Sequence, residues 1–92
     1  MQVLVVEDEK RLAEALQHIL GEQKYMVDLA FDGRDGLDYA LSGIYDVIIL
    51  DVMLPKLNGY DVASQLRKEK IDTPILMLTA KDQISDKVKG LD

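Results

Sequence analysis

The most informative stretch of the chain is DVIILDVMLP, Asp46 to Pro55. Four consecutive apolar residues, 47–50, lead to a single carboxylate at Asp51 and then to a turn. A short, continuous apolar run predicts a strand that is buried on both faces, as in a parallel sheet. Asn58-Gly59 is a further turn signal. The charge at the end of the strand indicates a residue that either caps a neighbouring element or binds a ligand.

Two other apolar runs, over residues 3–6 and 75–78, predict strands of the same kind. Residues 25–30 alternate between apolar and polar side chains, which is typical of an edge strand. The residues that follow the two apolar runs are Glu7 and Asp8 in the first case, and Thr79 and Ala80 in the second.

Apolar residues at helical spacing separate these strands. They predict a helix from Glu9 to a C-cap at Gly21, a second helix over residues 36–41 and a third over residues 60–70. A fourth stripe at helical spacing consists of Ile84, Val88 and Leu91.

This alternation of strands and helices predicts an α/β fold, a doubly wound parallel sheet with helices on both faces. The alternating strand belongs at one edge, and the apolar strands belong inside, which gives the order 2-1-3-4. The fourth strand would then have an open apolar edge, which favours aggregation. We therefore expect that a fifth strand and a helix are missing after Asp92, and that residues 1–92 form one incomplete domain.

Composition narrows the possible functions. The chain has 92 residues, a net charge of −6 and no cysteine, which excludes disulfides and thiolate metal sites. The acidic surface disfavours direct nucleic-acid binding, because the phosphate backbone would repel it. No apolar stretch reaches the roughly 20 residues that cross a bilayer, and no basic leader opens the chain. We expect a cytoplasmic protein with no membrane partner.

The carboxyl ends of the first, third and fourth strands meet at the point where strand order reverses, which is where open parallel sheets bind ligands. Glu7, Asp8 and Asp51 should therefore converge there, with Thr79 beside them. Taken singly, Asp8 and Thr79 can be helix caps, Asp51 a turn residue and Glu7 a solvated charge. Together, the three acids repel one another unless a cation is present. Oxygen ligands without histidine or cysteine favour Mg²⁺, with Mn²⁺ as the alternative.

Three motifs, VLVVEDE, DVIILDVMLPKLNGYDV and PILMLTAKD, resemble the receiver domain of bacterial two-component response regulators over the whole chain. The subfamily that it resembles most carries a winged-helix DNA-binding output domain. The resemblance implies a flavodoxin-like fold and a regulatory, non-enzymatic domain. It also implies a sensor histidine kinase as partner, homodimerisation or segment exchange, and DNA contact only through the output domain.

The resemblance also implies a role for individual residues. Asp51 would be the phospho-acceptor, and the metal would be held by Glu7, Asp8, Asp51 and the backbone carbonyl of Met53. The switch and phosphate-binding positions would be Thr79 and Ala80, and the residues that shape the loop would be Pro55 and Gly59.

Receivers also use a lysine and an aromatic switch residue on a fifth strand, and these 92 residues contain neither. A truncated module that binds metal or a kinase without transferring phosphate is therefore the alternative hypothesis. A phosphatase with a strand-end aspartate nucleophile would need a second aspartate at the position of Met53. A nucleotide-binding protein would need a glycine-rich loop after the first strand.

Overall fold

The computed structural model describes residues 1–78. Within this part of the chain, strands and helices alternate as the sequence predicts. In chain order they are β1 (Gln2–Val6), α1 (Lys10–Glu22), β2 (Met26–Ala30), α2 (Gly33–Ala40), β3 (Val47–Asp51), α3 (Gly59–Lys68) and β4 (Ile75–Leu78). Thr79, Ala80 and the apolar stripe at residues 84–91 lie outside the described residues.

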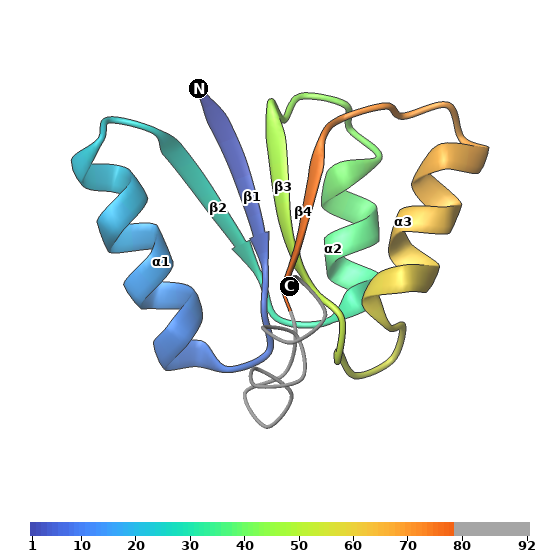
Figure 1. Cartoon of the computed structure of the whole chain (residues 1–92), viewed down its shortest axis with the longest axis horizontal. Helices are drawn as coiled ribbons and strands as arrows, with labels where there is room; N and C mark the ends of the chain where they lie inside the picture. The colour runs from blue at the N-terminus through green and yellow to red at the C-terminus, as the bar shows by residue number, and fades with distance from the viewer. Residues whose placement is uncertain (79–92) are drawn as a thin grey trace, which may run out of the picture.

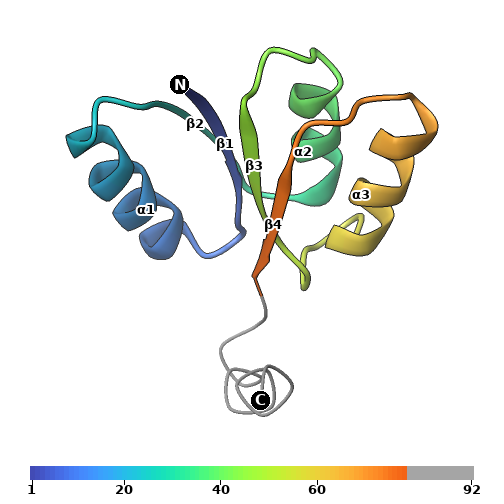
Figure 2. The ribbon, with the colours of Figure 1, turned by 45° about the horizontal axis from the view of Figure 1, so that its top comes forward.

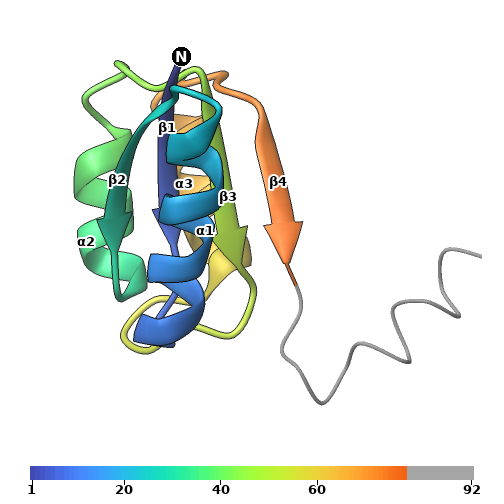
Figure 3. The ribbon, with the colours of Figure 1, turned by 90° about the vertical axis from the view of Figure 1, so that its left-hand side faces the viewer.

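The four strands form one parallel sheet in the order β2-β1-β3-β4, which confirms the predicted order (Figure 3). The register places Val5 beside Leu29 on one side and beside Ile49 on the other. Residues 3–6 are buried because β1 is flanked by strands on both sides and covered by helices. The prediction of a doubly wound α/β sheet is therefore correct.

Helices cover both faces of the sheet. α1 lies on one face beside β1 and β2, whereas α2 and α3 pack together on the other face (Figures 1 and 2). The main core forms between the sheet and the α2–α3 layer. Its fully buried larger side chains are Leu4, Val6, Ile48, Leu50, Val62 and Leu66.

The helix ends differ from the predictions. α1 continues through Gly21 to Glu22, and the left-handed residue after it is Lys24, with φ of 67°. α2 begins at Gly33, three residues earlier than predicted, because the side chain of Asp32 accepts a hydrogen bond from the Asp35 amide. Short polar side chains at helix N-caps accept hydrogen bonds from first-turn amides that have no partner within the helix. The spacing of apolar residues does not reveal such caps.

α3 begins one residue earlier than predicted, at Gly59. Asn58 is its N-cap, and the Asn58 side chain accepts a hydrogen bond of 2.9 Å from the Asp61 amide. The Asn58-Gly59 pair, predicted as a turn, is thus the start of a helix. The helix ends at Lys68 rather than Lys70.

The outer strands are less buried than the inner ones. Within residues 1–78, β4 is the last strand of the sheet, at the open edge that the order 2-1-3-4 predicts for it, and Leu76 on this strand is 56% exposed. On β2, Asp28 accepts a hydrogen bond of 2.6 Å from the hydroxyl of Tyr45, whose ring is buried. No helix within residues 1–78 is long and apolar enough to cross a membrane.

Candidate functional site

The candidate site lies at the carboxyl ends of β1 and β3, which point toward the same end of the molecule (Figure 1). β1 and β3 are hydrogen-bonded neighbours, whereas β2 lies beyond β1 on the other side. The loops after these two central strands therefore diverge to opposite faces of the sheet, which is the arrangement that forms a ligand-binding crevice in open parallel sheets. The residues that follow β1 and those that end β3 are brought together by this topology.

Three carboxylates meet in this crevice. Glu7 and Asp8 follow β1, and Asp51 is the last residue of β3. Each offers one carboxylate oxygen, and these oxygens all lie within 4.8 Å of one another. Glu7 and Asp51 are each only 4% exposed, whereas Asp8 is exposed. The fold therefore brings the three acids together, as the sequence predicts.

The environment disfavours negative charge at the two buried carboxylates. Burial raises the pKa of Glu7 to about 7, with repulsion from Asp51 and Asp8 adding to it, although the Glu9 amide partly opposes the shift. Burial also raises the pKa of Asp51, and the charge of Asp8 acts in the same direction. Close, partly desolvated acids raise one another's pKa in this way unless a cation neutralises them.

Backbone amides orient both buried side chains. The Glu9 amide donates a 3.0 Å hydrogen bond to Oε2 of Glu7, and the Met53 amide donates a 3.3 Å bond to Oδ1 of Asp51. Met53 is 53% exposed, and its backbone amide is the group shown to contact the acidic cluster. These bonds favour the ionised forms and fix the direction of each carboxylate.

The donor set suits a hard divalent cation. Among residues 1–78, one group of three or more potential metal-ligating side chains is close enough together to share an ion. It consists of Glu7, Asp8 and Asp51. Carboxylate oxygens on a partly open crevice match Mg²⁺, which binds few protein ligands and keeps several waters. A cation here would also relieve the repulsion that raises the pKa of both buried acids.

The β3–α3 loop, residues 52–58, closes back onto the end of β3. The Gly59 amide donates a 2.9 Å hydrogen bond to the carbonyl of Val52. A Cβ at Gly59 would lie 2.3 Å from the carbonyl oxygen of Asp51, so only glycine permits this approach. Pro55 lies at the middle of the loop, where its carbonyl accepts hydrogen bonds from the amides of Gly33 and Leu57.

Sequence reasoning missed three residues that hold the β3–α3 loop against the start of α2: Asp32, Gly33 and Lys56. Lys56 has a φ of 70°, a conformation that costs a residue other than glycine about 1–2 kcal/mol. Its ammonium lies 3.5 Å from Oδ2 of Asp32. The one available signal was the Asp32-Gly33 pair ahead of a helical pattern, which is a start signal for a helix.

The chain matches the family model described as the response regulator receiver domain over residues 3–92. It is 56% identical over 92 residues to the transcriptional regulatory protein DltR of Streptococcus agalactiae. It is 50% identical over 91 residues to the response regulator ArlR of Staphylococcus aureus. The two matches span 100% and 99% of this chain, but only 41% of the length of each relative.

Solved structures agree with these matches. The receiver domain of the Francisella response regulator 1452 superposes with a TM-score of 0.83 at 37% identity, covering 98% of this chain and 74% of that one. The response regulator TrrA of Thermotoga maritima, solved in complex with Mg²⁺-BeF, gives a TM-score of 0.80 at 40% identity, covering 92% and 75%. With its sheet order, its acidic strand-end crevice and these matches, the chain belongs to the response regulator receiver domain family.

Proposed function

We propose that this chain is a phosphorylation-activated switch in which Asp51 accepts a phosphoryl group from a phosphohistidine of a sensor histidine kinase. One observation carries the proposal: a buried strand directs Asp51 into a crevice shared with Glu7 and Asp8, with their carboxylate oxygens within 4.8 Å of one another. Ordinary structural roles give no reason to bury two mutually repelling acids together.

In the proposed reaction, a carboxylate oxygen of Asp51 attacks phosphorus and forms an acyl phosphate. The phosphorus–nitrogen bond of the phosphohistidine breaks, and its electron pair stays on the imidazole nitrogen. The Met53 amide, which donates to Oδ1, holds the carboxylate plane in a fixed direction during the attack. Such transfer depends mainly on positioning and on charge neutralisation.

The cofactor of this proposal is Mg²⁺, with Mn²⁺ as an alternative. When bound, it neutralises the charge that gathers on the transferred group. Glu7, Asp8 and Asp51 would hold it together with the backbone carbonyl of Met53. The TrrA complex with Mg²⁺-BeF supports this choice of metal. Pro55 and Gly59 would keep the loop that carries Met53 in place.

The acyl phosphate would act as the signal. Thr79 and Ala80 would contact the phosphoryl group, which adds negative charge and hydrogen-bond acceptors to the crevice. DltR is named a transcriptional regulator, and the chain covers less than half of it. The whole protein would therefore couple this domain to a DNA-binding output domain, with homodimerisation or segment exchange as the response.

The test is the intact mass of the purified protein before and after incubation with acetyl phosphate and Mg²⁺. We expect a gain of one phosphoryl group in the wild type and no gain after Asp51→Asn. Asp61→Asn is a matched control, because Asp61 is an exposed aspartate on α3, and it should be phosphorylated like the wild type. An unmodified wild-type protein would leave the alternative, a module that binds metal or a kinase without transfer.

A further inference from the structure

The β3–α3 loop rests on the first turn of α2. The Gly33 amide donates a 3.2 Å hydrogen bond to the carbonyl of Pro55. The contact between the two backbones is so close that a Cβ at Gly33 would lie 1.7 Å from the carbonyl oxygen of Leu57. The start of α2 and the middle of the loop are therefore fitted to each other through main-chain atoms.

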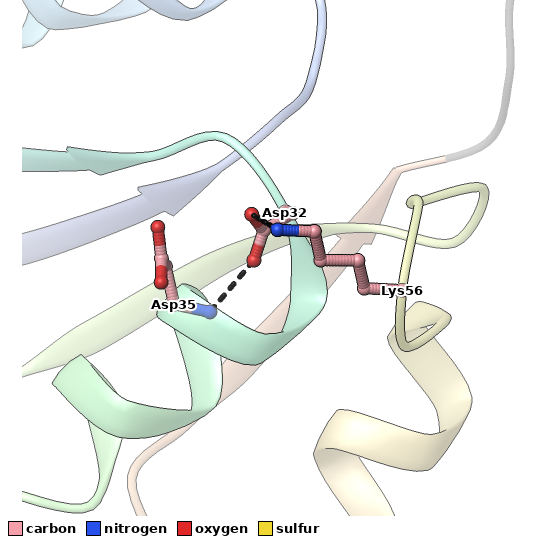
Figure 4. A network of polar contacts seen from close by, with 3 residues as sticks. All are labelled: Asp32, Asp35 and Lys56. Atoms are coloured by element: carbon pink, nitrogen blue, oxygen red, sulfur yellow. Dashed lines mark hydrogen bonds and ion pairs between the residues drawn. The ribbon is translucent and has the colours of Figure 1, made fainter.

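A side-chain contact joins the same two segments. Oδ1 of Asp32 accepts a 2.8 Å hydrogen bond from the Asp35 amide, and Oδ2 lies 3.5 Å from the ammonium of Lys56 (Figure 4). The Asp32 side chain is 15% exposed, whereas that of Lys56 is 67% exposed. One carboxylate thus caps α2 with one oxygen and holds the loop with the other.

The backbone of Lys56 suggests that its side chain is needed there. The φ of Lys56 is 70°. The Leu57 amide donates a 2.8 Å hydrogen bond to the carbonyl of Pro55, so Lys56 is the central residue of a tight turn. Glycine would adopt this turn without strain. Lys24 and Lys70 have similar φ values, but each follows a helix end, where a left-handed residue is common.

The loop connects this contact to the acceptor. Met53, which donates to Oδ1 of Asp51, belongs to the same short loop, and the Gly59 amide closes the loop at the Val52 carbonyl. The bond from Met53 to Asp51 is 3.3 Å, near the long end of the hydrogen-bond range. A displacement at Lys56 would therefore be transmitted to the hydrogen bond that orients the Asp51 carboxylate.

We propose that Asp32 and Lys56 are positioning residues for phosphoryl transfer, and that their ion pair holds the β3–α3 loop in the shape that Asp51 needs as the nucleophile. The proposal rests on the proposed function of Asp51. Neither residue touches the reacting atoms; each acts through the loop. Because Lys56 is largely exposed, the ion pair adds little to global stability, so its effect falls on rate rather than on unfolding.

The test measures the rate of phosphorylation by acetyl phosphate with saturating Mg²⁺ in the whole protein. Asp32→Asn keeps an oxygen to cap α2 but removes the charge, and Lys56→Met keeps the length of the stem. We expect each variant to react roughly three- to tenfold more slowly, because small misplacements of a reacting group have large effects on rate. The double variant should be no slower than either single one.

Two further variants of Lys56 separate the ion pair from the backbone. Lys56→Arg keeps the charge and should retain most of the wild-type rate. Lys56→Gly relieves the φ strain but removes the ion pair, so it should be as slow as Lys56→Met. The matched controls are Lys24→Met, at another left-handed lysine, and Asp38→Asn, at an exposed α2 aspartate, and both should react at the wild-type rate.

Amide hydrogen exchange provides a readout that does not depend on phosphorylation. The Leu57 and Gly33 amides should exchange faster in Asp32→Asn and Lys56→Met than in the wild type. Wild-type rates in both variants, or additive effects in the double variant, would overturn the proposal. If the wild type is not phosphorylated at all, the proposed function fails, and unchanged exchange at Leu57 would then refute the ion pair's role in the loop as well.

Discussion

Glu7 is the residue at which folding and function are in conflict. The residue is 4% exposed, and its carboxylate lies beside those of two other acids. An ionised carboxylate in such a place lowers stability, while a cation needs it ionised to bind. The metal-free domain should therefore be least stable under the conditions in which it binds Mg²⁺ best.

This conflict predicts a pH dependence. The pKa of Glu7 rises from its usual 4.5 to about 7 in the folded protein, so the folded state holds this proton more tightly than the unfolded chain. The resulting stability is complete below pH 4.5 and is lost as the pH rises through about 7, a loss of roughly 3 kcal/mol for a shift of this size. Urea unfolding of the metal-free protein from pH 4.5 to pH 8 measures it.

Glu7→Gln serves as the control, because it keeps the shape of the side chain without a titrating group. Its stability should fall less over the same pH range, and Mg²⁺ should stabilise it less at pH 8 than the wild type. Parallel stability curves for the two proteins would show that Glu7 does not hold a proton in the fold.

The acidic residues of the site could be predicted from the sequence, whereas their neighbours could not. Glu7 and Asp51 each follow an apolar run, and parallel strands bring their ends together whatever the loops do. The ion pair joins Asp32 and Lys56 from two different loops. It depends on a left-handed backbone conformation at Lys56, which a lysine in the sequence does not predict. The predicted chemical roles of the three acids stay predictions, as do those of Met53, Pro55, Gly59, Thr79 and Ala80.

At the scale of elements, α3 is placed by its first residue. Gly59 is buried and contacts the end of β3, so the helix begins against the strand that carries Asp51. Helix periodicity predicted α3 well in its interior, where Val62 and Leu66 are fully buried. It failed at the ends, because caps and main-chain contacts, and not apolar spacing, decide where a helix begins.

Gly59→Ala should destabilise the protein by about 2–3 kcal/mol, because the added methyl group would overlap backbone atoms that cannot move independently. A Cβ there would lie 2.3 Å from the Asp51 carbonyl oxygen and 2.9 Å from Cα of Val52. Gly21→Ala is the matched control: nothing lies within 4 Å of its Cβ, and α1 should gain roughly 0.5–1 kcal/mol. Chemical denaturation measures both, and equal stabilities would contradict the predicted contact.

At the scale of the whole molecule, the two faces of the sheet differ. α2 and α3 cover one face together, while α1 alone covers the other within residues 1–78 (Figure 2). The order of strands could be predicted because each strand has its own burial pattern, and parallel strands need helical crossovers. The edge position of β4, where Leu76 is 56% exposed, follows from that order, although its apolar run alone would equally fit an interior strand.

The α2–α3 face should therefore dominate stability. Leu66 is fully buried in the main core, and Leu66→Ala should cost about 2–5 kcal/mol through lost burial and an unfilled cavity. Ile19 on α1 is 56% exposed, so Ile19→Ala should change stability by less than about 1 kcal/mol. Equal losses in thermal unfolding would contradict this asymmetry.

The hydrogen bond from Tyr45 to Asp28 links the ionisation of a tyrosine to the unfolding of the domain. The chain has four tyrosines and no tryptophan, so tyrosine dominates its near-ultraviolet absorbance. Burial of the Tyr45 ring and its bond to Asp28 raise the pKa of the phenol well above its usual value of 10. The folded state thus holds this proton more tightly than the unfolded chain does. The stability that this proton contributes is lost as the pH rises beyond 10. The part of the tyrosinate absorbance that is missing from a Tyr45→Phe variant should therefore develop together with the loss of circular dichroism, so this difference reports unfolding without an attached dye.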